Sequence, residues 1–142
     1  MNIPKYNNGR NNFMGNINKP NSELSSEEIR DKRAVNCAKK LSIDYVNIVP
    51  ENGDFAPRRF SFDIPDTQNE SIYTLEVDKN NPKDQRIFSI GASRKGSDML
   101  VSCVLCNGTK KEIIDFLKDD KNNELFKKVV QETSDAIDDK FI

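Results

Sequence analysis

Histidine is absent from the 142 residues of this chain, and so is tryptophan. Without histidine the chain has no histidine-based catalytic triad, no imidazole general base and no histidine ligand for a metal. Cysteine is scarce as well, with three residues, an odd number that does not suit a secreted domain held together by disulfides. We therefore expect a cytoplasmic protein with reduced thiols, no cofactor and no bound metal.

Long apolar stretches and an excess of charge are also missing. The first residues contain no apolar run of the kind found in signal peptides, and no part of the sequence is apolar for long enough to cross a membrane. Lys and Arg number 22 against 23 Asp and Glu, which gives a formal net charge of −1. A chain without a global positive field is not expected to bind nucleic acid or acidic membranes non-specifically.

The first 24 residues differ in composition from the rest of the chain. Eight of them are Asn, and Pro and Gly interrupt the segment repeatedly. The scattered apolar residues follow neither a helical nor a strand period, so they cannot bury enough surface to offset the entropy of ordering. We expect residues 1–24 to form an Asn-rich flexible tail and residues 25–142 a single α+β domain. The tail either has no role or becomes ordered on a partner, with Tyr6, Phe13 and Met14 as anchors.

Two capping boxes predict where helices begin. Ser25 is followed three residues later by Glu28, and Thr109 by Glu112. The first box opens a helix whose apolar positions 34, 37, 38 and 41 lie on one face. The second opens a short helix over residues 110–117. After a polar break at 119–123, an apolar stripe over residues 125–137 predicts a last helix.

Between these helices the apolar residues alternate, as is typical of strands. We expect strands over 60–64, 72–77, 87–90 and 99–105, and the β-branched and aromatic run 45–49 predicts a further one. Turn residues fill the connections, so the sequence predicts an α+β fold: an antiparallel sheet of four to five short strands in a meander, one N-terminal helix and two C-terminal helices. Residues 99–105 are apolar on both faces, which favours a central strand that is covered on both sides.

The predicted core follows from these periods. It consists of the positions that share the inward face of each element: Phe60, Phe62, Tyr73, Leu75, Val77, Phe88, Ile90, Val101, Cys103, Ile113, Phe116, Leu117, Phe126 and Val130.

Two short motifs partly match patterns found in redox, metal-binding or phosphate-binding sites, but each departs from the pattern. Cys103 and Cys106 form a CxxC motif within a strand-like run, where a spacing of three would place the two thiols on opposite faces. We interpret the pair as structural, and a redox pair or a metal half-site are the alternatives. Gly91 and Gly96 have the spacing of a phosphate-binding loop, but the lysine that should follow the second glycine is missing. We interpret them as hairpin glycines and expect no tight phosphate binding.

Basic residues stand at two places in the predicted sheet. Arg58 and Arg59 begin one strand, and Arg94 and Lys95 lie at a hairpin tip. In a meander these positions fall at opposite ends of the sheet, so they form two separate basic spots. Separate spots suit a protein partner better than the continuous phosphate backbone of a nucleic acid.

The sequence therefore favours a small non-catalytic protein-interaction module, such as an inhibitor, an immunity-type protein or a phage or mobile-element accessory protein. The alternative is a nucleic-acid-binding module that uses the basic loops beside strand aromatics. An enzyme with thiol or carboxylate chemistry is a third class, for which the sequence offers no recognisable constellation. The candidate partner-binding residues are Arg58, Arg59, Arg94, Lys95, Tyr6, Phe13 and Met14.

Overall fold

A computed structural model describes residues 23–142, in which one helix precedes four strands and two helices follow them. Helix α1 (Ser26–Ile48) leads into strands β1 (Arg58–Asp63), β2 (Asn69–Val77), β3 (Arg86–Arg94) and β4 (Leu100–Gly108). Helix α2 (Lys110–Lys118), the short 3-10 helix η2 (Asp120–Asn122) and helix α3 (Asn123–Asp139) complete the chain. The predicted α+β class and helix order are confirmed, with four strands in the sheet. The predicted tail, residues 1–24, lies almost entirely outside the described residues.

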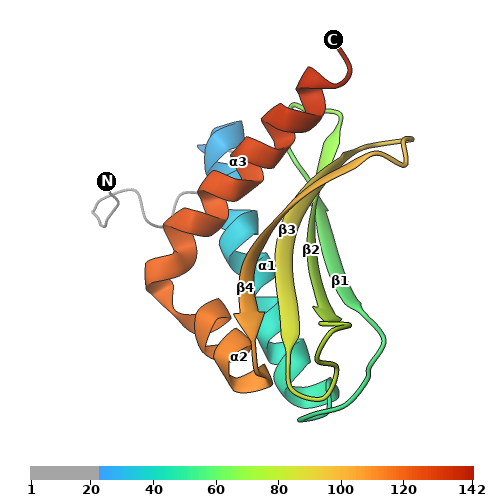
Figure 1. Cartoon of the computed structure of the whole chain (residues 1–142). Coiled ribbons are helices and arrows are strands. Elements are labelled where there is room, and N and C mark those ends of the chain that lie inside the picture. The colour runs from blue at the N-terminus through green and yellow to red at the C-terminus, as the bar shows by residue number, and fades with distance from the viewer. Residues whose placement is uncertain (1–22) are drawn as a thin grey trace.

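The sheet is an antiparallel meander in the order β1-β2-β3-β4. All three helices pack against one face of this sheet (Figure 1). Helix α1 packs on β1 and β2, α2 packs on β3 and β4, and α3 crosses β2, β3 and β4. In the part of the chain that the structure describes, the opposite face of the sheet carries no helix. The β3–β4 hairpin extends beyond the helices and ends in a free tip (Figure 1).

Both predicted capping boxes are present at the helix N-termini. The Ser25 and Thr109 side chains accept hydrogen bonds from the amides of Glu28 and Glu112, and each glutamate accepts one in return from the backbone of its capping residue. Each box satisfies two of the amide groups that the first turn of a helix leaves without a partner. The starts of α1 and α2 are therefore fixed by local sequence.

The core lies between the sheet and the helices and is centred on aromatic side chains. The Phe88 ring centroid is 5.8 Å from that of Tyr73, 6.2 Å from that of Phe116 and 6.1 Å from that of Phe126. The Tyr73 hydroxyl donates a 2.9 Å hydrogen bond to the Ala34 carbonyl, which ties β2 to α1. The predicted core residues that are fully buried are Tyr73, Leu75, Phe88, Ile90, Ile113, Leu117, Phe126 and Val130. Those that are half-buried are Phe60, Phe62, Val77, Val101 and Phe116.

The predicted strand over residues 45–49 is wrong, because α1 continues through this segment to Ile48. Leu41 and Tyr45 are four residues apart, and both side chains are fully buried against the core. This burial outweighs the strand preference of the β-branched residues between them. The helix ends at Val49, whose amide still bonds to the Tyr45 carbonyl, and Pro50 follows.

The prediction that residues 99–105 form a central strand is also wrong, because β4 is an edge strand. A β-bulge interrupts its pairing with β3: Cys106 lies opposite Phe88 and Val104 opposite Ser89, so Leu105 has no partner. The bulge also corrects the interpretation of the CxxC motif. Cys103 and Cys106 lie opposite Ile90 and Phe88, which both face the helices, so the two thiols share one face of the sheet. Cys103 is nevertheless exposed rather than buried.

Gly91 has a different role from the predicted one. Gly96 adopts a φ of 81° at the hairpin tip, as expected for a turn glycine. Gly91 lies inside β3, where a Cβ atom would come within 2.6 Å of the Val101 carbonyl oxygen. It is therefore required for the close approach of β3 and β4.

Candidate interaction surfaces

The two predicted basic spots lie at opposite ends of the sheet, as the meander requires. Arg58 is opposite Leu75 near the end of β2, whereas Arg94 is opposite Asn69 at the start of β2. The structure thus does not bring the four basic residues together. Tyr6, Phe13 and Met14 fall outside the described residues.

At the first spot, Arg58 is used within the fold. Its guanidinium forms a two-point contact with the Asp44 carboxylate of α1, at 2.8 and 3.2 Å. The hydrogen bond to Asp44 raises the pKa of Arg58 above its ordinary value, and this contact joins α1 to β1. Arg59 is exposed on the face of the sheet away from the helices, and it is the part of this spot that is available to a partner.

At the second spot, both cations have acidic partners within the chain. The Arg94 guanidinium lies 2.7 Å from the Asp138 carboxylate of α3, and its Nε donates a hydrogen bond to the Asn69 side chain. The same guanidinium lies over the Phe141 ring, 4.5 Å from its centroid. Lys95 pairs with Asp63 at 3.2 Å. Arg94 therefore acts mainly to hold the C-terminal end of α3 against the sheet.

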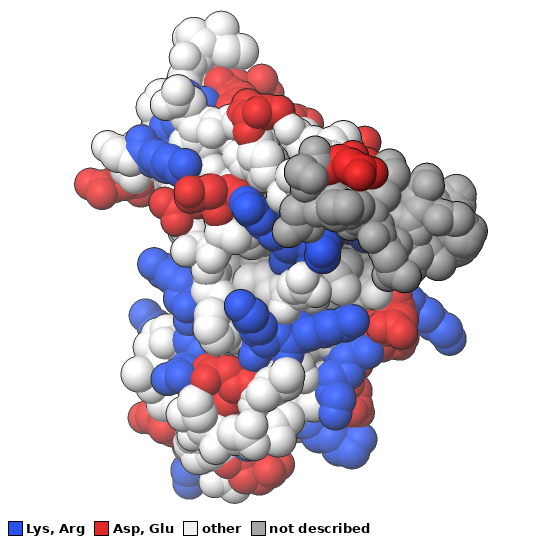
Figure 2. Space-filling view, turned by 180° about the vertical axis from the view of Figure 1, so that it is seen from behind, with Lys and Arg blue, Asp and Glu red and all other residues white. Residues whose placement is uncertain are grey.

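A third surface, which the sequence analysis did not single out, is the outer face of α1. It consists of exposed residues that recur at helical spacing on the side away from the core: Lys32, Arg33, Asn36, Lys39, Lys40, Ile43, Val46 and Asn47. No acidic residue lies between Asp31 and Asp44. The Lys and Arg side chains gather across the middle and lower part of the molecule when it is seen from behind (Figure 2).

The C-terminal half of this outer face is apolar. The Ile43 side chain is 62% exposed and that of Val46 47%, and Ile48 beside them is 57% exposed. The sequence carried a signal for this surface, because positions 32, 36, 39, 43 and 46 follow the helical period. The signal was lost when residues 45–49 were interpreted as a strand.

The thiols differ sharply in their environment. Burial raises the pKa of the Cys37 thiol to about 12, so it stays protonated near neutral pH. Burial also raises the pKa of Cys106, and the nearby Glu112 adds to the effect. A thiol is nucleophilic as the thiolate, so both environments disfavour reactivity. Within residues 23–142, no three His, Cys, Asp or Glu side chains are grouped to hold a metal ion.

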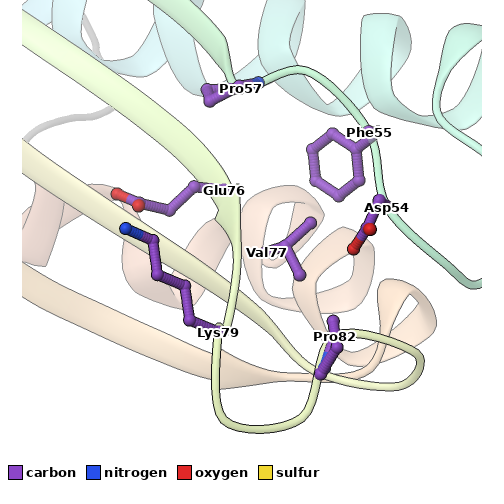
Figure 3. Close-up of a pocket in the computed structure, with 7 residues that line it drawn as sticks. All are labelled: Asp54, Phe55, Pro57, Glu76, Val77, Lys79 and Pro82. Carbon is purple, nitrogen blue, oxygen red and sulfur yellow. The ribbon is translucent and has the colours of Figure 1, made fainter.

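A shallow pocket of about 380 Å³ lies between the loop before β1 and the β2–β3 connection. Phe55 and Val77 form an apolar wall, and the charged ends of Glu76 and Lys79 lie to one side (Figure 3). The Phe55 ring covers the guanidinium of Arg86, which is fully buried and bonds to the carbonyls of residues 82, 85 and 51. These contacts hold the loop before β1 against the β2–β3 connection. We therefore assign the pocket a structural role rather than a binding role.

Comparisons with protein-family models, with curated proteins and with solved structures find no match to this chain. None of the helices in residues 23–142 is long and apolar enough to span a membrane. The fold and its surfaces define a small α+β protein with a helical layer on one face of a four-stranded meander. The functional argument therefore rests on the surfaces themselves.

Proposed function

We propose that this chain is a non-catalytic protein-interaction module that binds its partner through the outer face of α1. The observation that carries the proposal is the combination on one helical face of Lys39 and Lys40 with the exposed apolar side chains of Ile43 and Val46. An exposed apolar patch beside charged residues is typical of protein-binding surfaces. The partner surface would carry acidic side chains next to an apolar groove.

The same combination supports a protein partner over a nucleic acid. Cations strengthen binding to a phosphate backbone, but exposed Ile43 and Val46 add little to the free energy of that binding. Burial of both side chains in an apolar groove of a protein would contribute favourably. The four basic residues of the alternative function are divided between two ends of the sheet, and Arg58, Arg94 and Lys95 have acidic partners in the fold. An inhibitor, an immunity-type protein and an accessory protein of a mobile element all suit this mode of action.

Affinity capture with a paired set of variants tests the proposal. The α1 variant combines Lys39→Glu, Lys40→Glu and Ile43→Ser, and the control combines Lys121→Glu and Lys128→Glu on η2 and α3 with Met99→Ser, three exposed positions outside α1. We expect the wild type and the control to capture the same protein, and the α1 variant to lose it. Circular dichroism establishes that each variant is folded. Equal capture by all three chains would contradict the proposal.

Titration with single-stranded RNA at two salt concentrations distinguishes the nucleic-acid-binding alternative from the protein-interaction proposal. Nucleic-acid binding predicts an affinity that falls steeply with salt and weakens on Arg59→Glu. The protein-interaction proposal predicts only weak, non-specific binding, unchanged by that substitution. Salt-sensitive binding that depends on Arg59 would favour the nucleic-acid-binding module.

A further inference from the structure

Strand β4 leaves its outer edge unpaired. It is the last strand of the sheet, and within residues 23–142 no other segment forms a backbone hydrogen bond with that edge. The strand is nine residues long and contains no charged residue between Leu100 and Gly108. Leu100 and Val104 are 48% and 61% exposed. An open row of backbone donors and acceptors along an uncharged strand is a template for pairing with another strand.

The opposite edge of the sheet is built differently. Strand β1 is six residues long and carries Arg58, Arg59 and Asp63. A short, charged edge strand is the usual protection against edge-to-edge association. The contrast between the two edges of one sheet singles out β4 as the edge that takes a further strand.

Charges at the two ends of β4 favour a second copy of this chain in antiparallel orientation. Asp98 precedes the strand, and Lys111, whose side chain is 80% exposed beside Asp115 of its own chain, follows it, whereas Lys110 is turned toward the Val49 carbonyl. Antiparallel pairing places the start of one β4 beside the end of the other, so unlike charges approach each other at both ends. Parallel pairing of two copies would bring like charges together, which is unfavourable.

The same orientation covers apolar surface that one copy leaves open. Val101 lies on the helix-facing side of β4 near the start of the strand, where it is only half-buried. The start of β4 belongs to the hairpin that extends beyond the helices (Figure 1). In each copy α2 packs on β4 and follows its end directly, so antiparallel pairing brings α2 of one copy toward the uncovered half of the other strand.

We infer that two copies of this chain pair through β4 to form one continuous eight-stranded antiparallel sheet with a two-fold axis near the middle of β4. Such an interface is self-complementary, as two-fold symmetry requires. It uses a different surface from the outer face of α1, so it stands or falls independently of the proposed function.

Sedimentation velocity on the full chain over a range of protein concentrations tests this inference. We expect the wild type to have twice the chain mass of 16.2 kDa. Val104→Lys places a charge in the middle of the free edge, and we expect that variant to have the mass of one chain. The matched control is Ser61→Lys on exposed β1, which should remain a dimer. The circular dichroism spectrum of Val104→Lys should match that of the wild type, because the Val104 side chain is exposed and its replacement leaves the core unchanged.

A short bismaleimide provides a second readout that locates the interface. Cys103 is exposed near the middle of β4, so the reagent should link two wild-type chains and leave Cys103→Ser unlinked. A wild type that has the mass of one chain at all concentrations would overturn the inference. So would a Val104→Lys variant that remains a dimer, which would place the interface elsewhere. A dimer that incorporates a strand from another protein would show a mass that is not twice the chain mass, and would also contradict self-pairing.

Discussion

At the scale of single residues, the fold depends on a few buried or part-buried polar contacts that join distant segments. Arg58 binds Asp44, Arg94 binds Asp138, and Tyr73 donates to the carbonyl of Ala34. The partners in these contacts lie from 14 to 44 residues apart in the sequence. No local pattern could reveal them, which is why the sequence analysis treated Arg58 and Arg94 as free for a partner. The structure gives both of them a fixed role in holding a helix against the sheet.

Two buried tyrosines make a matched pair for measuring such a contact. Tyr73→Phe removes the hydroxyl that bonds to Ala34, whose carbonyl keeps its bond within α1, so we expect a loss of about 0.5–1.5 kcal/mol in the free energy of unfolding. The Tyr45 hydroxyl lies near the Arg86 guanidinium but bonds to no carbonyl, so Tyr45→Phe should lower that free energy by less than Tyr73→Phe does. Urea unfolding measures both, and equal losses would show that the hydroxyl of Tyr73 contributes nothing specific.

The three thiols should react in an order set by their exposure. We expect iodoacetamide at pH 8 to modify Cys103 rapidly and to leave Cys37 unmodified, because Cys37 is buried and its pKa is raised to about 12. Cys106 should react at an intermediate rate. Mass spectrometry of the alkylated chain follows each site, with denatured protein as the control in which all three react. Rapid modification of Cys37 in the folded protein would contradict the burial of this face of α1.

At the scale of elements, features that depend on neighbouring residues could be predicted from the sequence. Features that depend on contacts between distant segments could not. The capping boxes at Ser25 and Thr109 fixed both helix starts, because a cap depends on residues three positions apart. The end of α1 was misjudged because the burial of Tyr45 depends on the sheet, which the run 45–49 itself does not reveal. The edge position of β4 was missed for the same reason: an apolar strand looks the same in the sequence whether or not a neighbour covers it.

The second capping box predicts a pH dependence of stability. Hydrogen bonds from Thr109 lower the pKa of Glu112 below its usual value of 4.5. A carboxyl whose pKa is depressed on folding contributes stability that is present above the unfolded value and is lost as the pH falls through the folded value. We therefore expect the contribution of this cap to disappear as the pH is lowered below about 4.5. The measurement is the urea midpoint of wild type and Glu112→Gln from pH 7 to pH 3.

The urea midpoints of wild type and Glu112→Gln should differ at pH 7 and converge near pH 3. Glu27→Gln, at an exposed position in the first turn of α1 outside the capping pair, serves as the control. A constant difference between wild type and Glu112→Gln at every pH would show that the ionised carboxylate is not what stabilises the cap.

At the scale of the whole molecule, the surfaces divide into three with different roles. The ends of the sheet are tied to the helices by ion pairs, the outer face of α1 presents cations beside apolar side chains, and the outer edge of β4 is open to a second chain. The fold class and the separation of the two basic spots followed from the sequence. The α1 surface did not, because it exists only when the helix continues through Val46 to Ile48.

The most direct test of the account is a titration of the isotopically labelled chain with its captured protein partner, followed by amide chemical shifts in NMR spectra. We expect the largest chemical-shift changes in α1 between Lys32 and Ile48. We also expect Lys39→Glu combined with Lys40→Glu to lower the affinity for the partner at least tenfold, about 1.4 kcal/mol in binding free energy. Largest shifts around Arg59 or around Lys95, with α1 unperturbed and the affinity of the double variant unchanged, would contradict it.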